Sequence, residues 1–349
     1  MKARTLSGRE GSEKRNTDKR DGSRITRRLA LGAMAGSLVA LRSPIAKADS
    51  KLRVGKAVAV NIGYVPLDVG IEHGIFQKHG LEIEEMNFAG GAKIAQAMTA
   101  GAVDISLSAG PDMAFVAKGA PEIAIASIAE SAAFMVYLVG KQSNAHGMED
   151  LKGKKIGITS PGSLTDWLAE RLNQVNGWTS ASDRVTKVAV GGSAQATLAA
   201  LKTGQVDASI GAPQLGYELE EQHEGRLLFD CSHYVGPIEL YTIFTSTALT
   251  QSNPDLVRRF LKGWLESIAF MKTHKDETVR IAAKVMGAPP AIAARTYDSL
   301  ISKFSTDGKF GGKALETLGQ SFQDLKTLPG PVQMEKLYTE RFLPTESQT

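Results

Sequence analysis

The chain has 349 residues, of which 42% are hydrophobic and 22% charged, and a formal net charge of +4. Residues 1–48 contain 12 of the 41 basic and 4 of the 37 acidic residues, so the remainder carries 29 basic and 33 acidic side chains and a net charge of about −4. A mildly acidic chain of this length, without a block of basic residues, is large enough for one or two domains and gives no indication of nucleic-acid binding.

The first 48 residues have the pattern of an export signal. Thr26-Arg27-Arg28 precedes an apolar run of 13 residues, Leu29–Leu41, that is too short to span a bilayer of about 30 Å. Ala46-Lys47-Ala48 then provides the small residues that signal peptidase accepts. The paired arginines resemble a twin-arginine signal, so we predict cleavage after about Ala48 and release into the periplasm. No cysteine near this site is available for a lipid anchor. The alternative to a cleaved signal is that the segment is an N-terminal amphipathic helix or membrane anchor.

Residues 49–135 are predicted to form the first part of one lobe. Apolar or alternating runs indicate strands at 54–60, 81–88, 103–107 and 123–127, separated by helices at 67–78, 93–100 and 112–118. This alternation of strands and helices is typical of a doubly wound parallel sheet.

Residues 136–240 are predicted to form a second lobe of the same α/β class. Its strands are expected at 134–139, 156–159, 185–190, 206–210 and 227–229, with helices at 164–176 and 194–202. The chain then continues through an apolar strand at 240–245 into a mostly helical segment, 241–349, which we expect to return to the first lobe. Its helices are predicted at 255–272, 277–285 and 291–303. The apolar runs 134–139 and 240–245 are candidate crossings between the lobes.

One phrase occurs twice in the chain, as Ala100-Gly101-Ala102-Val103-Asp104-Ile105-Ser106 and as Thr203-Gly204-Gln205-Val206-Asp207-Ala208-Ser209. Each copy predicts a helix that stops at glycine, a short buried strand and an open loop. Two such units imply two similar lobes that face each other across a cleft, where a small molecule binds beyond the strand ends. Asp104 and Asp207 begin the strands, so we expect them to accept backbone N–H groups and exclude them from the site.

The loops after the strands carry the candidate ligand-binding residues. In the first lobe these are Gly63, Tyr64, Gly90, Gly91, Ser108, Ala109 and Gly110. In the second lobe they are Ser160, Gly162, Ser163, Leu164, Thr165, Gly192, Ala212, Pro213 and Gln214, and Glu239 precedes the second crossing.

Each candidate also has an interpretation that involves no ligand. The hydroxyls at 160–165 lie at a helix start, where free N–H groups attract an anion, but Ser163 with Asp166 also resembles a plain capping box. The glycines allow close approach of a ligand or simply form bends. Glu239 is placed to accept a ligand amine or to remain a solvated hinge carboxylate. Cys231 is expected to be a small buried core residue.

Catalytic and metal-binding patterns are missing from the chain. The six histidines show no HxxxH spacing, and there is no GxSxG, Walker or GxGxxG motif after a strand. We therefore predict no metal, no cofactor and no enzymatic activity.

Several motifs taken together resemble a known family. They are Gly63-Tyr64-Val65-Pro66, Phe88-Ala89-Gly90-Gly91, Gly101-Ala102-Val103-Asp104, Leu151-Lys152-Gly153-Lys154-Lys155-Ile156-Gly157 and Gly204-Gln205-Val206-Asp207-Ala208. Their order and spacing, over roughly residues 52–275, resemble the solute-binding proteins of ABC importers in the nitrate, sulfonate and taurine group. That group shares its fold with thiamine-pyrimidine synthases. The resemblance implies a two-lobe periplasmic binding protein fold of type II.

From these patterns we expect a monomeric periplasmic receptor. It would close by hinge motion on a small, anionic organic solute such as a sulfonate, taurine or nitrate, and deliver it to a membrane permease with a cytoplasmic ATPase. The alternatives are an enzyme of the thiamine-pyrimidine synthase kind, a receptor for a pyrimidine or aromatic carboxylate, and a ligand-sensing domain of a regulator. The export signal and the single cysteine argue against the enzyme. The regulator is disfavoured because the sequence contains no DNA-binding segment.

Overall fold

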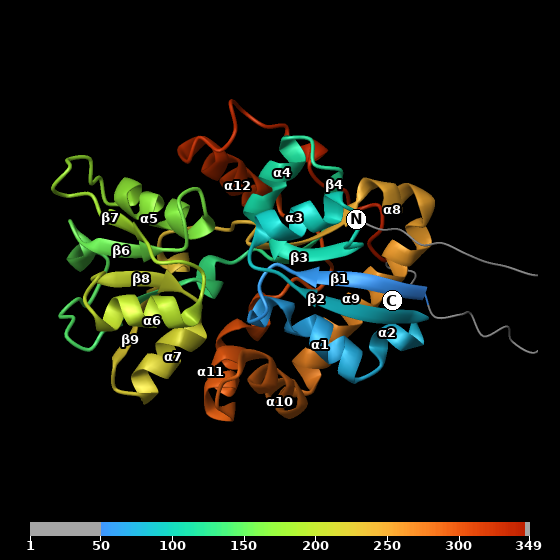
Figure 1. The fold of residues 1–349 in the computed structure, drawn as a ribbon, viewed down its shortest axis with the longest axis horizontal. Helices are drawn as coiled ribbons and strands as arrows, with labels where there is room; N and C mark the ends of the chain where they lie inside the picture. The colour runs from blue at the N-terminus through green and yellow to red at the C-terminus, as the bar shows by residue number, and fades with distance from the viewer. Residues whose placement is uncertain (1–49, 346–349) are drawn as a thin grey trace, which may run out of the picture. The chain divides into compact units, whose positions relative to one another are not determined.

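The computed structural model describes residues 50–345, so the predicted export signal and its cleavage site lie outside the described residues. The strands of this part of the chain form two five-stranded sheets (Figure 1). We call each sheet with its helices a lobe.

Lobe 1 contains the sheet of order β2-β1-β3-β10-β4. Its strands are β1 (Ser50–Lys56), β2 (Leu81–Asn87), β3 (Ile105–Ala109), β4 (Glu122–Ala129) and β10 (Tyr241–Ser246). The helices along it are α1 (Val65–Glu72), α2 (Ile75–Lys78), α3 (Gly91–Thr99), α4 (Met113–Ala117), α8 (Thr247–Ser252) and α9 (Pro254–Thr273).

Lobe 2 contains the sheet of order β7-β6-β8-β5-β9. Its strands are β5 (Val136–Gly140), β6 (Lys155–Ile158), β7 (Thr186–Ala189), β8 (Ala208–Gly211) and β9 (Gly225–Asp230). Its helices are α5 (Leu164–Val175), α6 (Ala194–Lys202) and α7 (Pro213–Glu221). After α9 the chain forms α10 (Lys275–Met286), α11 (Pro290–Leu300) and α12 (Gly312–Asp324).

The two sheets have the same plan, which confirms the predicted two-lobe α/β fold. In each order the strand of the repeated phrase, β3 or β8, is central, and the fourth place belongs to a strand that arrives from the other lobe, β10 or β5. These two arriving strands run antiparallel to both of their neighbours. The sheets are therefore mixed, and the expectation of purely parallel sheets was wrong for one strand in each.

The repeated phrase forms the same local structure twice. Gly101 and Gly204 follow the C-caps of α3 and α6, and each has a φ of +71°, a conformation that glycine adopts without strain. The Asp104 carboxylate accepts the backbone N–H of Arg53 at 2.9 Å, and the Asp207 carboxylate accepts that of Lys155 at 2.8 Å. Both aspartates therefore join neighbouring strands, as their position at the strand starts predicts.

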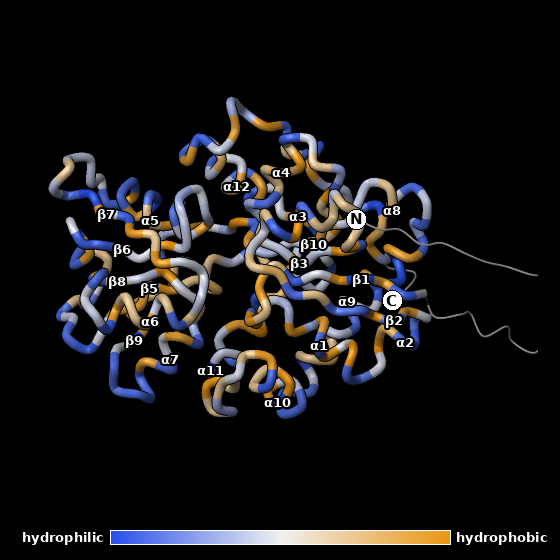
Figure 2. Tube along the Cα trace, in the orientation of Figure 1, coloured by the Kyte–Doolittle hydropathy of each residue, from blue (hydrophilic) through white to orange (hydrophobic). Residues whose placement is uncertain are grey.

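Apolar side chains fill the interior of both lobes. Trp167 and Trp264 are among the largest fully buried side chains, and Cys231 is completely buried, as predicted. The turns at the outer end of lobe 2 are mainly hydrophilic, whereas hydrophobic residues gather along the strands and inner helix faces (Figure 2). Within residues 50–345, no helix combines the length and the apolar character needed to cross a membrane.

Candidate functional site

A cavity of about 590 Å³ is lined by both lobes and by the end of α12. Ten of the seventeen predicted site residues line it: Tyr64, Gly90, Gly91, Ser108, Ala109, Ser160, Gly162, Ser163, Leu164 and Thr165. Tyr64 comes from the turn before α1, and the others come from the ends of β3 and β6 and from the starts of α3 and α5. The strand ends of both sheets therefore meet at one space, as expected for open α/β sheets.

The wall formed by lobe 1 is built from aromatic and polar side chains. The Asn61 side chain accepts the N–H of Gly63 at 2.8 Å and so fixes the turn that presents Tyr64. The Tyr64 and Tyr241 rings meet edge to face, with centroids 5.6 Å apart. Both rings are buried, which raises the pKa of each hydroxyl. These phenols stay protonated at ordinary pH, and the Tyr241 hydroxyl already has a hydrogen bond with the Asn61 side chain.

The wall formed by lobe 2 is a loop that is held together by its own side chains. The Ser163 hydroxyl accepts the N–H of Asp166 at 3.3 Å and caps α5, while the Asp166 carboxylate accepts the N–H of Gly162 at 2.7 Å. The Thr165 hydroxyl accepts the N–H of Thr159 at 2.8 Å. Ser163 therefore caps its helix and also lines the cavity, so the two interpretations of this loop are compatible, but fewer of its N–H groups remain for a ligand.

Seven predicted site residues do not line this cavity, namely Gly63, Gly110, Gly192, Ala212, Pro213, Gln214 and Glu239. Gly63 packs against the Tyr241 ring, and a side chain at Gly110 would collide with the Glu239 carbonyl. Glu239 is completely buried and accepts the Thr242 hydroxyl at 2.8 Å, so it is not the solvated hinge carboxylate we considered. Burial holds the pKa of Glu239 well above its usual range.

The structure adds cavity residues that the sequence patterns do not reveal. Asn61 and Tyr241 belong to the turn and to the crossing strand described above, and Ser321, Phe322, Leu325 and Thr327 come from α12 and the turn after it. The last group lies beyond the final predicted helix, and nothing local in its sequence indicates that it returns to the site. Asp112 also lines the cavity and lies two residues after the predicted site residue Gly110.

Asp112 gives the cavity its negative charge. Its carboxylate accepts the Ser108 hydroxyl and also has a hydrogen bond with the backbone of Ala109. Burial among protein atoms raises its pKa to about 6, against the opposing effect of these two hydrogen bonds. Lys118 is the single Lys or Arg among the described residues that line the cavity.

C-terminal helices touch lobe 2 at two places. The indole N–H of Trp167, on α5, donates to the Asp324 carboxylate at the end of α12 at 2.9 Å. On α11, the Arg295 guanidinium lies 2.8 Å from the Glu220 carboxylate and 4.0 Å from the centroid of the Tyr217 ring, both on α7. In Figure 1, α12 and α11 lie at the upper and lower borders between the two lobes.

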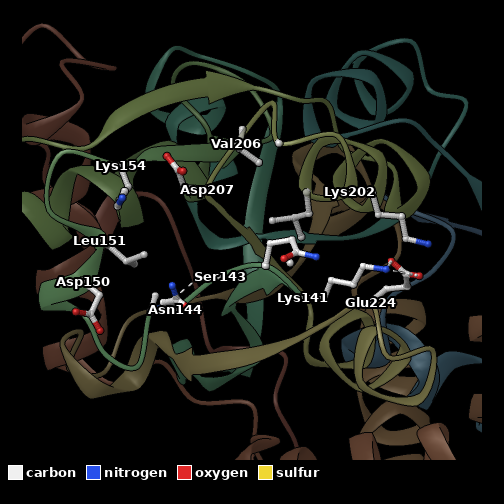
Figure 3. Close-up of a pocket in the computed structure, with 15 residues that line it drawn as sticks. Lys141, Ser143, Asn144, Asp150, Leu151, Lys154, Lys202, Val206, Asp207 and Glu224 are labelled. Carbon is white, nitrogen blue, oxygen red and sulfur yellow. Dashed lines mark hydrogen bonds and ion pairs between the residues drawn. The ribbon is translucent and has the colours of Figure 1, made fainter.

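A second cavity, of about 580 Å³, lies in lobe 2 at the end of β5 and the starts of β6 and β8 (Figure 3). It is lined by charges of both signs, and the Lys141 ammonium and the Glu224 carboxylate pair across 3.3 Å. Asp207, at its rim, already accepts the N–H of Lys155. Because this cavity belongs to lobe 2 alone, the cavity between the lobes remains the candidate site. Within residues 50–345, no group of three His, Cys, Asp or Glu side chains is arranged to hold a metal ion.

The model of the family described as NMT1/THI5 like matches residues 61–278. The chain belongs to this family. A putative thiamine biosynthesis protein of Haemophilus influenzae is 28% identical over 224 residues, which cover 62% of this chain and 68% of the relative. A putative binding protein of Brucella abortus is 25% identical over 299 residues, which cover 80% and 90%.

The fold is also that of known periplasmic binding proteins. The periplasmic aliphatic sulphonate binding protein SsuA from Escherichia coli matches with a TM-score of 0.70 and 19% identity, over 83% of this chain and 92% of that one. The expected periplasmic binding protein fold is thereby confirmed.

Proposed function

We propose that this member of the NMT1/THI5-like family is the periplasmic substrate-binding component of an ABC importer. The observation that carries the proposal is the cavity of about 590 Å³ that both lobes line, a size suited to a small organic solute. Two chain segments join the lobes, 130–135 before β5 and 231–240 before β10. A ligand that contacts both walls favours the closed arrangement by its differential affinity, and the permease would recognise that arrangement.

Binding fits the cavity better than catalysis does. The described lining residues include no His and no Cys, and Cys231 is buried elsewhere, where burial raises the pKa of its thiol to about 12. A cysteine nucleophile or a histidine base is therefore not available among these residues. The enzyme alternative is favoured only by the family description and by the name of the Haemophilus influenzae relative.

For the ligand we propose the class expected from the sequence, a small organic solute with an acidic group such as a sulfonate or taurine. The hydroxyls of Ser160, Ser163 and Thr165 on the lobe 2 wall support this class. The E. coli neighbour is named for aliphatic sulphonates. A pyrimidine or an aromatic carboxylate is the alternative, because Tyr64 and Tyr241 line the same cavity.

A thermal-shift screen of residues 49–349 tests the proposal with taurine, alkanesulfonates, nitrate, aromatic carboxylates and pyrimidines. A ligand at a hundredfold excess over Kd stabilises the folded protein by about 2.7 kcal/mol. Ala89→Trp, at the cavity, should abolish the shift, and Ala181→Trp, on an exposed loop elsewhere, should preserve it. Turnover of a panel compound without any such stabilisation would refute the receptor function.

A further inference from the structure

One carboxylate in the cavity has no cation beside it. Asp112 lies at the end of the loop after β3, next to Ser108, on the lobe 1 wall. None of the ion pairs formed within residues 50–345 includes Asp112, and Lys118 on the same wall is not paired with it. The hydrogen bonds from Ser108 and Ala109 therefore act without a neutralising charge.

The position of the Asp112 carboxylate limits where in the cavity an acidic group of the ligand can bind. A side-chain carbon on Gly91 would collide with the Asp112 carboxylate, so the carboxylate lies directly against the first turn of α3. The start of a nine-residue helix attracts negative charge, and here the protein supplies that charge itself. An anionic group of the ligand is repelled from this end of the cavity and belongs at the other wall.

Apart from the start of α3, which carries only a partial positive charge, the residues around Asp112 provide no cation for its carboxylate. Ser108 is a hydroxyl donor and Ala109 contributes its backbone, so an uncharged amide oxygen at position 112 would accept the same hydrogen bonds. A half-buried carboxylate with no full positive charge beside it costs stability. The missing partner is then expected in the ligand.

We propose that the solute presents an amino or other N–H donor group to Asp112, and that this contact makes the receptor selective for nitrogen-bearing solutes. The inference rests on the proposed function and narrows it. An acidic group, where the solute has one, lies toward the hydroxyls of residues 160–165 on the opposite wall. The ligand class is thus an amino acid-like or amino-substituted compound rather than a simple anion.

Matched pairs of probes isolate the donor group. Taurine is compared with ethanesulfonate, β-alanine with propionate, and 4-aminopyrimidine with pyrimidine, by calorimetric titration of residues 49–349. In a pair that binds, we expect the compound with the amino group to bind at least about tenfold more tightly than the compound without it. This is the gain that a hydrogen bond to a charged group provides. Asp112→Asn should reduce that preference to less than about threefold, and Asp112→Ser serves where the first variant does not fold.

Another carboxyl of lobe 1 serves as the control. Glu122 is buried, its pKa is raised to about 7 by burial and by Asp112, and it does not line the cavity. Glu122→Gln should leave the preference for amino members unchanged. Asp112→Asn should also raise the melting temperature of the ligand-free protein at pH 8, because it removes a half-buried charge that no cation neutralises. If Asp112 has only a structural role, the variant should instead lose both stability and ligand affinity.

The outcomes separate the two proposals. Equal affinity for both members of the pairs in the wild-type protein, or an unchanged preference in Asp112→Asn, would overturn the role of Asp112 while leaving the receptor intact. If no probe and no co-purified solute binds the wild-type protein, the receptor function itself fails, and the role of Asp112 fails with it.

Discussion

The contact between α11 and α7 offers a direct test of hinge closure, because it is remote from the cavity. Arg295→Ala removes the ion pair with Glu220 and the stacking over Tyr217. Neither Arg295 nor its two partners lines the cavity between the lobes. Any effect of the variant on ligand affinity must therefore act through the arrangement of the lobes.

The size of the effect follows from the exposure of the pair. The Arg295 and Glu220 side chains are 52% and 33% exposed, so the ion pair contributes about 0.5 kcal/mol after screening by solvent. A cation–π contact at such a site adds about 0.5–1 kcal/mol. If both contacts form only when the lobes are closed, the affinity for ligand should fall about five- to tenfold, since about 1.4 kcal/mol corresponds to a factor of ten.

A similar ion pair with a nearby aromatic ring, formed between α10 and α11 and not between α11 and lobe 2, provides the control. Lys275 pairs with Asp298 at 2.6 Å and lies 5.8 Å from the Tyr297 ring centroid, and all three residues belong to α10 and α11. Lys275→Ala should change ligand affinity less than twofold. Calorimetric titration with the ligand found in the screen measures both variants. If Arg295→Ala weakens binding no more than Lys275→Ala does, the α11–α7 contact does not depend on closure.

Three further outcomes follow from burial. Burial raises the pKa of Asp112 to about 6 and that of Glu122 to about 7, so above about pH 4 the folded protein keeps protons that the unfolded chain releases. Denaturant titrations should therefore show the unfolding free energy falling between pH 4 and 7, by up to about 3 kcal/mol for each group. An unfolding free energy that rises over this range would contradict the raised pKa values of both carboxyls. Gly110→Ala should destabilise the protein by more than about 2 kcal/mol, because the added methyl group would overlap the Glu239 carbonyl. A melting temperature within about 2 °C of wild type, as for a neutral substitution, would show that the backbone moves to make room for the methyl group. The Cys231 thiol should resist a thiol-specific reagent in the folded protein and react in denaturant; labelling of the native state would mean that this region opens readily.

Much of the fold could be predicted because its strands are short apolar or alternating runs between glycine-rich turns. All ten strands of the described residues lie at or within a few positions of the predicted runs. Strands such as β3 are buried on both faces and therefore have continuous apolar sequence, whereas β2 is half exposed and alternates. Strand direction leaves no such trace, so the antiparallel course of β5 and β10 was not foreseen. Helix α7 was also missed, because Pro213 and Gly216 resemble loop residues although proline is well tolerated in a first helical turn.

The candidate site was predictable only where it follows the strands. Ser108 and Ser160 line the cavity because strand ends of both sheets meet there. Phe322 and Thr327 reach the same cavity from a distant part of the chain, which depends on how helices pack and not on any local pattern. Asp112 was predicted only as the first residue of a helix, two positions after the predicted site residue Gly110, and its lack of a cationic partner becomes visible only in three dimensions.

The exchange of strands between the lobes also sets an order of assembly. The five strands of the lobe 2 sheet lie between residues 136 and 230, so this sheet can be completed as soon as that stretch of chain has been synthesised. The sheet of lobe 1 must wait for β10, which is inserted between β3 and β4 and ends at Ser246. A nascent chain that stops before β10 therefore has one finished sheet and one with two unpaired strand edges, which are surfaces prone to association with other chains.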